Sequence, residues 1–136
     1  MHTNRVLIVD DDTLVRNALK RCLRAEEYDV DTAESSREAF ECLTNHQYAV
    51  VISDLKMPRI DGMALLRWVA ENQPKVRRIL LTGHADLDVV ITAVNDVGVF
   101  RIIQKPWDDT ELRTLVQTAI SEAEAEQDLN DRAYIG

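Results

Sequence analysis

The chain has 136 residues, of which 46% are hydrophobic and 29% are charged, and its net charge is −8 at pH 7. This length suits one domain with a hydrophobic core of its own. The acidic balance argues against direct binding of nucleic acid by this domain, because such binding requires a basic surface.

The sequence contains no apolar run close to the ~18 residues of a membrane span, and it does not open with a signal-peptide pattern. We therefore expect a cytoplasmic location and no membrane contact. The two cysteines, Cys22 and Cys42, lie in amphipathic patterns without metal-ligand spacing, so we expect both to be small core side chains.

Five short apolar or β-branched runs alternate along the chain with amphipathic helical patterns. The predicted strands are residues 5–9, 29–33, 50–53, 78–81 and 100–104. The first, third and fourth runs are almost continuously apolar, which is typical of strands covered on both faces. Repeated strand–helix alternation predicts an α/β fold in which helices cover both faces of a parallel sheet.

Polar residues before the helical patterns predict where the five helices begin. The candidate caps, in chain order, are Asp12 or Thr13, Ser35 or Ser36, Asp61, Asp86, and Asp108 or Asp109. The inward stripe of the first helix is expected to include Leu14, and that of the fourth helix to include Val90, Ile91 and Val94. After residue 120 the apolar stripe is lost. We therefore predict a domain over residues 1–120 and a helical extension or linker over residues 121–136.

Charged and hydroxyl side chains follow four of the predicted strands. Asp10 and Asp11 follow the first, Asp54 the third, Thr82 the fourth and Lys105 the fifth. In open α/β sheets, ligands bind beyond the carboxyl ends of the strands. Three carboxylates gathered there repel one another unless a cation neutralises them. The pattern therefore predicts a hard divalent metal ion beside a nucleophilic aspartate.

Four segments carry a resemblance to a known family. They are VLIVDDD at 6–12, SDLKMPRIDG at 53–62, LTGH at 81–84 and QKPW at 104–107. In this order and spacing they resemble the receiver domain of bacterial two-component response regulators, over residues 4–120. The resemblance implies a flavodoxin-like fold with a five-stranded parallel sheet in the order 2-1-3-4-5.

The resemblance implies that Asp54 accepts a phosphoryl group from a phosphohistidine on a sensor histidine kinase or phosphotransfer protein. It also implies Mg²⁺ held by Asp11, Asp54 and the backbone carbonyl of Lys56, with Asp10 in support. Oxygen ligands suit Mg²⁺, and carboxylates are known nucleophiles in covalent phosphoryl transfer. Such a domain is not an enzyme with an external substrate, since it catalyses only its own phosphorylation and dephosphorylation.

Two further residues receive roles from the resemblance. Lys105 would neutralise an oxygen of the acceptor, and Thr82 would donate its hydroxyl to the phosphoryl group after transfer. Lys105–Pro106 is a candidate cis peptide bond that would orient the lysine. Gly62 is expected to permit a turn or a close backbone approach after the acceptor strand. His84, like Lys56, occupies a position where the family varies the rate of dephosphorylation.

The expected output surface comprises the fourth helix, the fifth strand and the fifth helix, which would act on an output domain or partner protein. Its exposed candidates are Asp88, Asn95, Arg101, Trp107 and Arg113. A homodimer through this surface is left open. The family commonly has an aromatic residue three positions before the lysine, where this chain has Ile102. Switching by rotation of an aromatic side chain is therefore in question, although a bulky aliphatic side chain can still change its packing.

The sequence is also compatible with three other interpretations of the function. The WDD segment after Lys105–Pro106 and the GHAD segment at 83–86 resemble receivers attached to cyclic-dinucleotide phosphodiesterase domains. The DDDT segment at 10–13 has a superficial likeness to the DxDxT motif of haloacid dehalogenase-type hydrolases, but its threonine comes one residue early. A third alternative is a binding module that has kept the fold and lost phosphorylation. The complete set of Asp11, Asp54, Thr82 and Lys105 argues against it.

Overall fold

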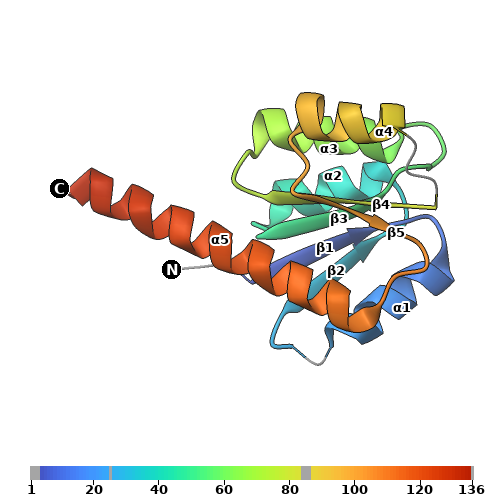
Figure 1. Cartoon of the computed structure of the whole chain (residues 1–136), viewed down its shortest axis with the longest axis horizontal. Helices are drawn as coiled ribbons and strands as arrows, with labels where there is room; N and C mark the ends of the chain where they lie inside the picture. The colour runs from blue at the N-terminus through green and yellow to red at the C-terminus, as the bar shows by residue number, and fades with distance from the viewer. Residues whose placement is uncertain (1–3, 25, 84–86, 136) are drawn as a thin grey trace.

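Five parallel strands form the central sheet of the computed structural model, which describes residues 4–24, 26–83 and 87–135 (Figure 1). The strands are β1 (Arg5–Val9), β2 (Asp29–Ala33), β3 (Val50–Asp54), β4 (Arg77–Thr82) and β5 (Arg101–Gln104). They pair in the order β2-β1-β3-β4-β5. The predicted fold class and strand order are therefore confirmed, with boundaries within one residue of those expected.

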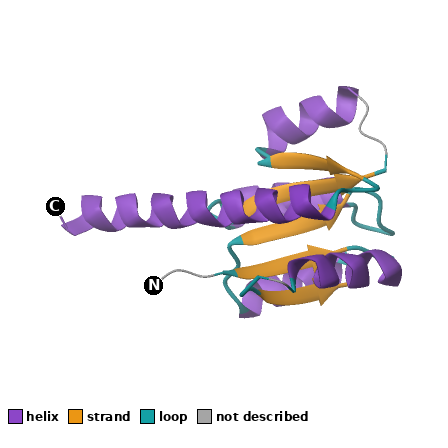
Figure 2. Ribbon diagram, turned by 60° about the horizontal axis from the view of Figure 1, so that its bottom comes forward, coloured by secondary structure: helices purple, strands orange, loops and turns teal. Residues whose placement is uncertain are grey.

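Helices cover both faces of this sheet (Figures 1 and 2). They are α1 (Thr13–Leu23), α2 (Ser36–Asn45), α3 (Gly62–Asn72), α4 (Leu87–Ile91) with its π-helical continuation η1 (Thr92–Val97), and α5 (Asp109–Ile135). The α2, α3 and α4 helices lie on one face, and α1 and α5 lie on the other. Among the described residues, no helix is both long and apolar enough to cross a membrane.

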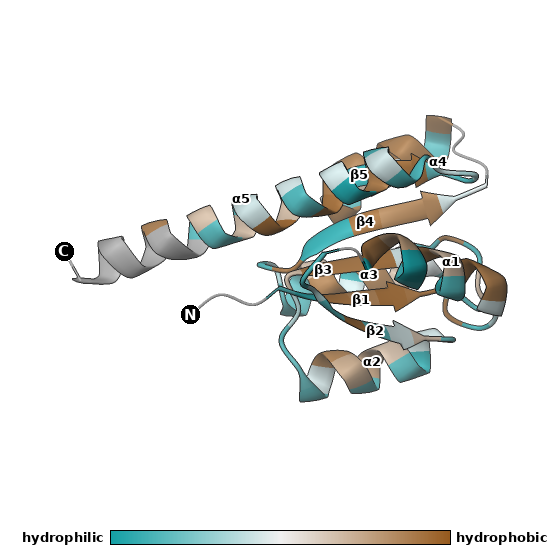
Figure 3. Ribbon diagram, turned by 90° about the horizontal axis from the view of Figure 1, so that it is seen from below, coloured by the Kyte–Doolittle hydropathy of each residue, from teal (hydrophilic) through white to brown (hydrophobic). Residues whose placement is uncertain are grey.

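The core consists of two apolar layers that share the strands. Along β1, Leu7 packs into the layer under α2 and α3, whereas Val6 and Ile8 pack into the layer under α1 and α5. Because successive side chains point to opposite faces, a strand buried on both sides must be apolar throughout. All five residues of β3 are buried, and the strands of the sheet are largely hydrophobic (Figure 3); the polar Ser53 and Asp54 come only at the carboxyl end of β3.

Side-chain caps set the beginnings of the helices where the sequence predicted them. Asp12, Ser35 and Asp61 accept hydrogen bonds from backbone N–H groups in the first turns of α1, α2 and α3. Asp108 accepts one from Glu111 at the beginning of α5. The structure thus chooses Asp12 over Thr13, Ser35 over Ser36 and Asp108 over Asp109. The predicted cap Asp86 lies outside the described residues.

The predicted inward faces of the first and fourth helices are partly wrong. Leu14 is 78% exposed, because it lies in the first turn of α1, beyond the edge of the sheet. In the fourth helix, Ile91 and Val94 are 47% and 54% exposed, and Ala93 and Val97 are buried instead. The residues that pack inward, Val89, Ala93 and Val97, recur every four residues, so the predicted stripe was out of phase with the one observed. The helix also changes there from α4 to the π-helical η1.

Helix α5 continues without a break through residue 120 and runs past the sheet (Figure 1). Its packed stripe, from Leu112 to Ile120, ends where the sequence predicted. Beyond that point Arg77, the first residue of β4, holds the helix through a 2.7 Å ion pair between its guanidinium and the carboxylate of Glu126. The treatment of residues 121–136 as a separate extension or linker stays a prediction.

The loop after β3 depends on a close backbone approach at Gly62. The Gly62 N–H donates to the carbonyl of Leu55 at 2.8 Å, and a Cβ on this glycine would overlap the carbonyl oxygen of Asp54. This contact packs the beginning of α3 against the end of β3. The expected close approach at Gly62 is therefore confirmed.

Gly62→Ala is expected to destabilise the protein by about 2–4 kcal/mol, because the added methyl group must push the Asp54 carbonyl or α3 away. Urea unfolding would measure the loss. Gly83→Ala is the control: a Cβ on Gly83 would meet nothing within 4 Å, so its effect on stability should stay within ~0.5 kcal/mol. Equal stability of the Gly62→Ala variant and the wild type would contradict the steric reading.

Arg59 has a φ of 70° and is the only non-glycine residue with positive φ in the described part of the chain. An L-residue in this left-handed region is strained by its Cβ, whereas glycine is not. Arg59→Gly should therefore stabilise the protein by about 0.5–1 kcal/mol, after the gain is offset by the larger entropy of glycine in the unfolded chain. Arg59→Ala keeps the Cβ and should show no such gain in thermal unfolding. A gain of equal size in both variants would assign the effect to the guanidinium instead.

Candidate functional site

The carboxyl ends of the central strands are aligned by their pairing. Asp54, the last residue of β3, pairs with Leu81, and Thr82, the last residue of β4, pairs with Gln104. The backbone N–H of Lys105 then donates to the carbonyl of Thr82 at 2.8 Å. The polar residues that the sequence placed after separate strands thus share one edge of the sheet.

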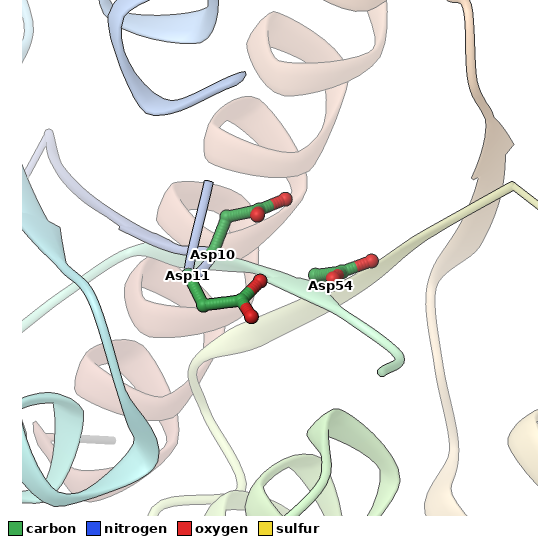
Figure 4. A group of neighbouring side chains, drawn as sticks. All are labelled: Asp10, Asp11 and Asp54. Carbon is green, nitrogen blue, oxygen red and sulfur yellow. The ribbon is translucent and has the colours of Figure 1, made fainter. Parts of the chain in front are cut away.

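Three carboxylates meet at this edge. One oxygen from each of Asp10, Asp11 and Asp54 lies within 4.8 Å of the others (Figure 4). Asp10 is fully buried and Asp54 is 8% exposed, whereas Asp11 is exposed. Two of the acids are therefore held in the protein and the third faces solvent, which leaves one open side for an incoming group.

Lys105 links the two buried acids. Its ammonium group is 3.1 Å from Oδ2 of Asp10 and 3.1 Å from Oδ1 of Asp54, and its side chain is 25% exposed. One positive charge thus contacts two negative charges on different strands. The cluster keeps a net negative charge, so it still favours a further cation.

The hydrogen bonds of the turn between β1 and α1 distinguish Asp10 from Asp11. The Asp10 carboxylate accepts from the Asp12 N–H at 2.9 Å through Oδ1 and from Lys105 through Oδ2. The Asp11 carboxylate makes no hydrogen bond to any other described residue, and it keeps its oxygens available to a metal ion. Carboxylate oxygens are the hard ligands that Mg²⁺ prefers. The donor set therefore fits Mg²⁺, with Asp11 and Asp54 better placed than Asp10 for direct coordination.

Burial and neighbouring charges shift two pKa values at the site. Burial raises the pKa of Asp54, the charge of Asp10 raises it further, and the contact with Lys105 only partly offsets this rise. Burial lowers the pKa of Lys105, but its contacts with Asp10 and Asp54 outweigh this effect and leave the pKa raised. Lys105 is therefore a firmly protonated cation at neutral pH.

The remaining predicted residues surround this cluster. Thr82 is 2% exposed at the end of β4, and Lys56 is exposed in the loop after Asp54. The Lys105–Pro106 peptide bond is cis, as expected. Trp107, expected to be exposed, is half-buried: it packs against the core, and its indole N–H donates to Asp109 at 2.9 Å at the start of α5. His84 lies outside the described residues.

The sequence did not identify two residues that brace the site. The guanidinium of Arg16 donates to the backbone carbonyl of Asp10 at 2.7 Å. The buried hydroxyl of Ser36 donates to the carbonyl of Ile60 at 2.9 Å and ties α2 to the loop after β3. Both contacts go to backbone carbonyls, which every residue has, so the residue types alone do not predict these bonds. Only the position of Arg16, about one turn after the acids, could have suggested its role.

Removal of the Asp54 charge should stabilise the metal-free protein at neutral pH. Folding raises the pKa of Asp54, so its carboxyl group ionises more readily in the unfolded chain than in the folded protein. At a pH above the raised pKa, the ionised carboxylate therefore lowers the free energy of unfolding. The penalty is absent below the ordinary pKa of an aspartate, where the group is protonated in both states. In EDTA at pH 7, Asp54→Asn should therefore raise the Tm by a few degrees, and the gain should shrink as pH falls toward that ordinary value.

Asp88→Asn is the control for this experiment, because it removes a charge from an exposed residue of α4 outside the cluster. It should leave the Tm nearly unchanged. An Asp54→Asn variant that is less stable than the wild type at pH 7 without metal would contradict the predicted penalty.

Comparisons with known proteins agree with this geometry. The family model described as the response regulator receiver domain matches residues 6–117. The transcriptional regulator NtrC of Klebsiella pneumoniae is 38% identical over 120 residues, which cover 88% of this chain and 25% of NtrC. FixJ of Bradyrhizobium diazoefficiens is 27% identical over 88% of this chain and 58% of its own length. The chain thus spans about a quarter of NtrC.

Solved structures give the same result. The signal receiver domain of an HD domain-containing protein from Pseudomonas fluorescens Pf-5 has a TM-score of 0.87 and 30% identity, covering 91% of this chain and 99% of that domain. A CheY-like receiver domain protein from Methanospirillum hungatei JF-1 has a TM-score of 0.86 and 30% identity, covering 91% of this chain and 98% of its own. Fold, site geometry and family match together show that this chain belongs to the response regulator receiver domain family of two-component systems.

Proposed function

We propose that Asp54 is the phosphoryl acceptor of this receiver domain, in a Mg²⁺-dependent reaction whose donor is a phosphohistidine on a sensor histidine kinase or phosphotransfer protein. The observation that carries the proposal is the convergence of Asp10, Asp11, Asp54 and Lys105 at one edge of the sheet. We place this reaction in the bacterial cytoplasm.

The residues around Asp54 would divide the work of transfer. Asp11, Asp54 and the carbonyl of Lys56 would hold Mg²⁺, and Asp10 would support them by binding Lys105. Bound there, Mg²⁺ would neutralise charge on the phosphoryl oxygens. Phosphoryl transfer depends mainly on positioning and charge neutralisation, which a rigid strand end can supply.

The covalent step exchanges one bond to phosphorus for another. A carboxylate oxygen of Asp54 attacks the phosphorus, and the P–N bond to the donor imidazole breaks with its electron pair remaining on the nitrogen. Lys105 already contacts Oδ1 of Asp54 and would stay beside the new phosphoryl group. The Thr82 hydroxyl, on the neighbouring strand, would then donate to a phosphoryl oxygen.

Phosphorylation adds roughly two negative charges to this edge and attracts hydrogen-bond donors toward it. We propose that the response alters the surface formed by α4, β5 and α5 and so controls an output domain or a partner protein. Asp88, Asn95 and Arg101 are exposed on this surface, and Arg113 is half-buried. Homodimerisation through it and attachment to a phosphodiesterase domain stay predictions. Ile102 is partly buried against the core, so a change in its aliphatic packing would be one route for the switch.

Incubation with acetyl phosphate and Mg²⁺, followed by intact mass spectrometry, tests the acceptor role. The wild type should gain one phosphoryl group, and Asp54→Asn should gain none. Asp11→Asn should gain it slowly, because it removes one proposed metal ligand while leaving the acceptor. Equal labelling of the wild type and Asp54→Asn would show that Asp54 is not the acceptor.

The same preparations distinguish a self-labelling domain from a hydrolase. A domain that acts only on itself should not turn over a chromogenic phosphoester. Repeated turnover abolished by Asp10→Asn would favour the hydrolase alternative instead.

A further inference from the structure

Arg16 lies outside the expected site and contacts it through a side-chain hydrogen bond. It lies one turn into α1, and its half-buried guanidinium makes two described hydrogen bonds, to the carbonyl of Asp10 at 2.7 Å and to the hydroxyl of Thr13 at 3.0 Å. Neither acceptor is a carboxylate. Arg16 therefore places a cation beside the acids without occupying the oxygens that a metal ion would need.

The contact with Asp10 completes the hydrogen bonding of a fully buried residue. The Asp10 N–H donates to the carbonyl of Ala33 at 3.1 Å, its carboxylate is held by Asp12 and Lys105, and its carbonyl is held by Arg16. A bond from a charged donor at 2.7 Å is of the stronger class. Without Arg16, this carbonyl would lose its only described partner.

The geometry of the peptide unit transmits this constraint to Asp11. The carbonyl of Asp10 lies in the same rigid plane as the N–H and Cα of Asp11, because the peptide bond between them is planar. The next residue, Asp12, is fixed as the cap of α1 through the N–H of Leu14. Asp11 thus lies between two fixed points, although its own carboxylate has no described partner.

We propose that Arg16 is a positioning residue for the metal site: it holds the Asp10–Asp11 peptide plane so that the Asp11 carboxylate faces Asp54. The inference rests on the proposed Mg²⁺-dependent function and adds a residue to it. Arg16 would act through Asp11 and would not touch the metal ion or the phosphoryl group.

The sign of the effect separates this role from simple electrostatics. Removal of a positive charge near a cation site should strengthen Mg²⁺ binding, because the cation is then repelled less. Loss of positioning should weaken Mg²⁺ binding, because the ion must first order Asp11. The two effects oppose each other, and a net weakening identifies positioning.

The test compares Mg²⁺ titrations of the wild type, Arg16→Met, Arg16→Lys and Lys20→Met, followed by amide chemical shifts and tryptophan fluorescence. Arg16→Met keeps the length of the side chain but removes its donors, and we expect its Kd for Mg²⁺ to rise about 10-fold. Arg16→Lys retains one donor and the charge, and it should recover at least part of the affinity. Lys20→Met removes a charge from an exposed position one turn further along α1 and should bind Mg²⁺ as well as the wild type.

A second measurement separates positioning from general damage. With acetyl phosphate as donor, the half-saturating Mg²⁺ concentration of Arg16→Met should rise by the same factor, while its rate at saturating Mg²⁺ stays close to that of the wild type. Mg²⁺ binding by Arg16→Met that is equal to or tighter than that of the wild type would overturn the proposal, and so would weakened binding that Arg16→Lys does not restore at all. A wild type that neither binds Mg²⁺ nor accepts phosphate would instead refute the proposed function.

Discussion

The ammonium group of Lys105, shared between Asp10 and Asp54, is the interaction on which the site depends. Two carboxylates whose oxygens lie within 4.8 Å of each other repel by roughly 3.5 kcal/mol or more if the effective dielectric constant is ~20. Both are nearly or fully buried, so solvent screens this repulsion poorly. Lys105, which follows β5, reduces this repulsion but leaves the three carboxylates with an excess of negative charge. This excess makes the site receptive to a metal ion.

The order of the strands makes this arrangement possible. With β1 and β4 flanking β3, the strand that ends at Asp54 has a neighbour that supplies acids on one side and a neighbour that supplies a hydroxyl on the other. The backbone N–H of Lys105 donates to the carbonyl of Thr82, which fixes the position of Lys105 relative to β4. Asp54 and Thr82 are placed by the pairing of buried apolar strands, so this part of the site takes its precision from the core.

Sequence patterns predicted the strands, four of the helix caps and the convergence of the charged residues because each depends on local chemistry. An apolar run that is buried on both faces has few alternatives to a central strand, and polar residues after such runs must lie at the edge of the sheet. The fourth helix was less predictable, because its short apolar pattern fits more than one phase: Ala93 and Val97 pack inward and Val94 faces solvent. The bonds from Arg16 and Ser36 to backbone carbonyls were missed because any carbonyl can accept them and residue types do not record such contacts.

Helix α5 also has a mechanical consequence. Its final fifteen residues, beyond Ile120, span about 22 Å at the rise of an α-helix, so a tilt of ~5° at the base would displace the far end by about 2 Å. Arg77, which forms the ion pair with this segment, is the first residue of β4, and Thr82 is the last residue of the same six-residue strand. Because Arg77 binds Glu126, six residues beyond Ile120, this ion pair resists such a tilt, and its loss would free the far end of the helix.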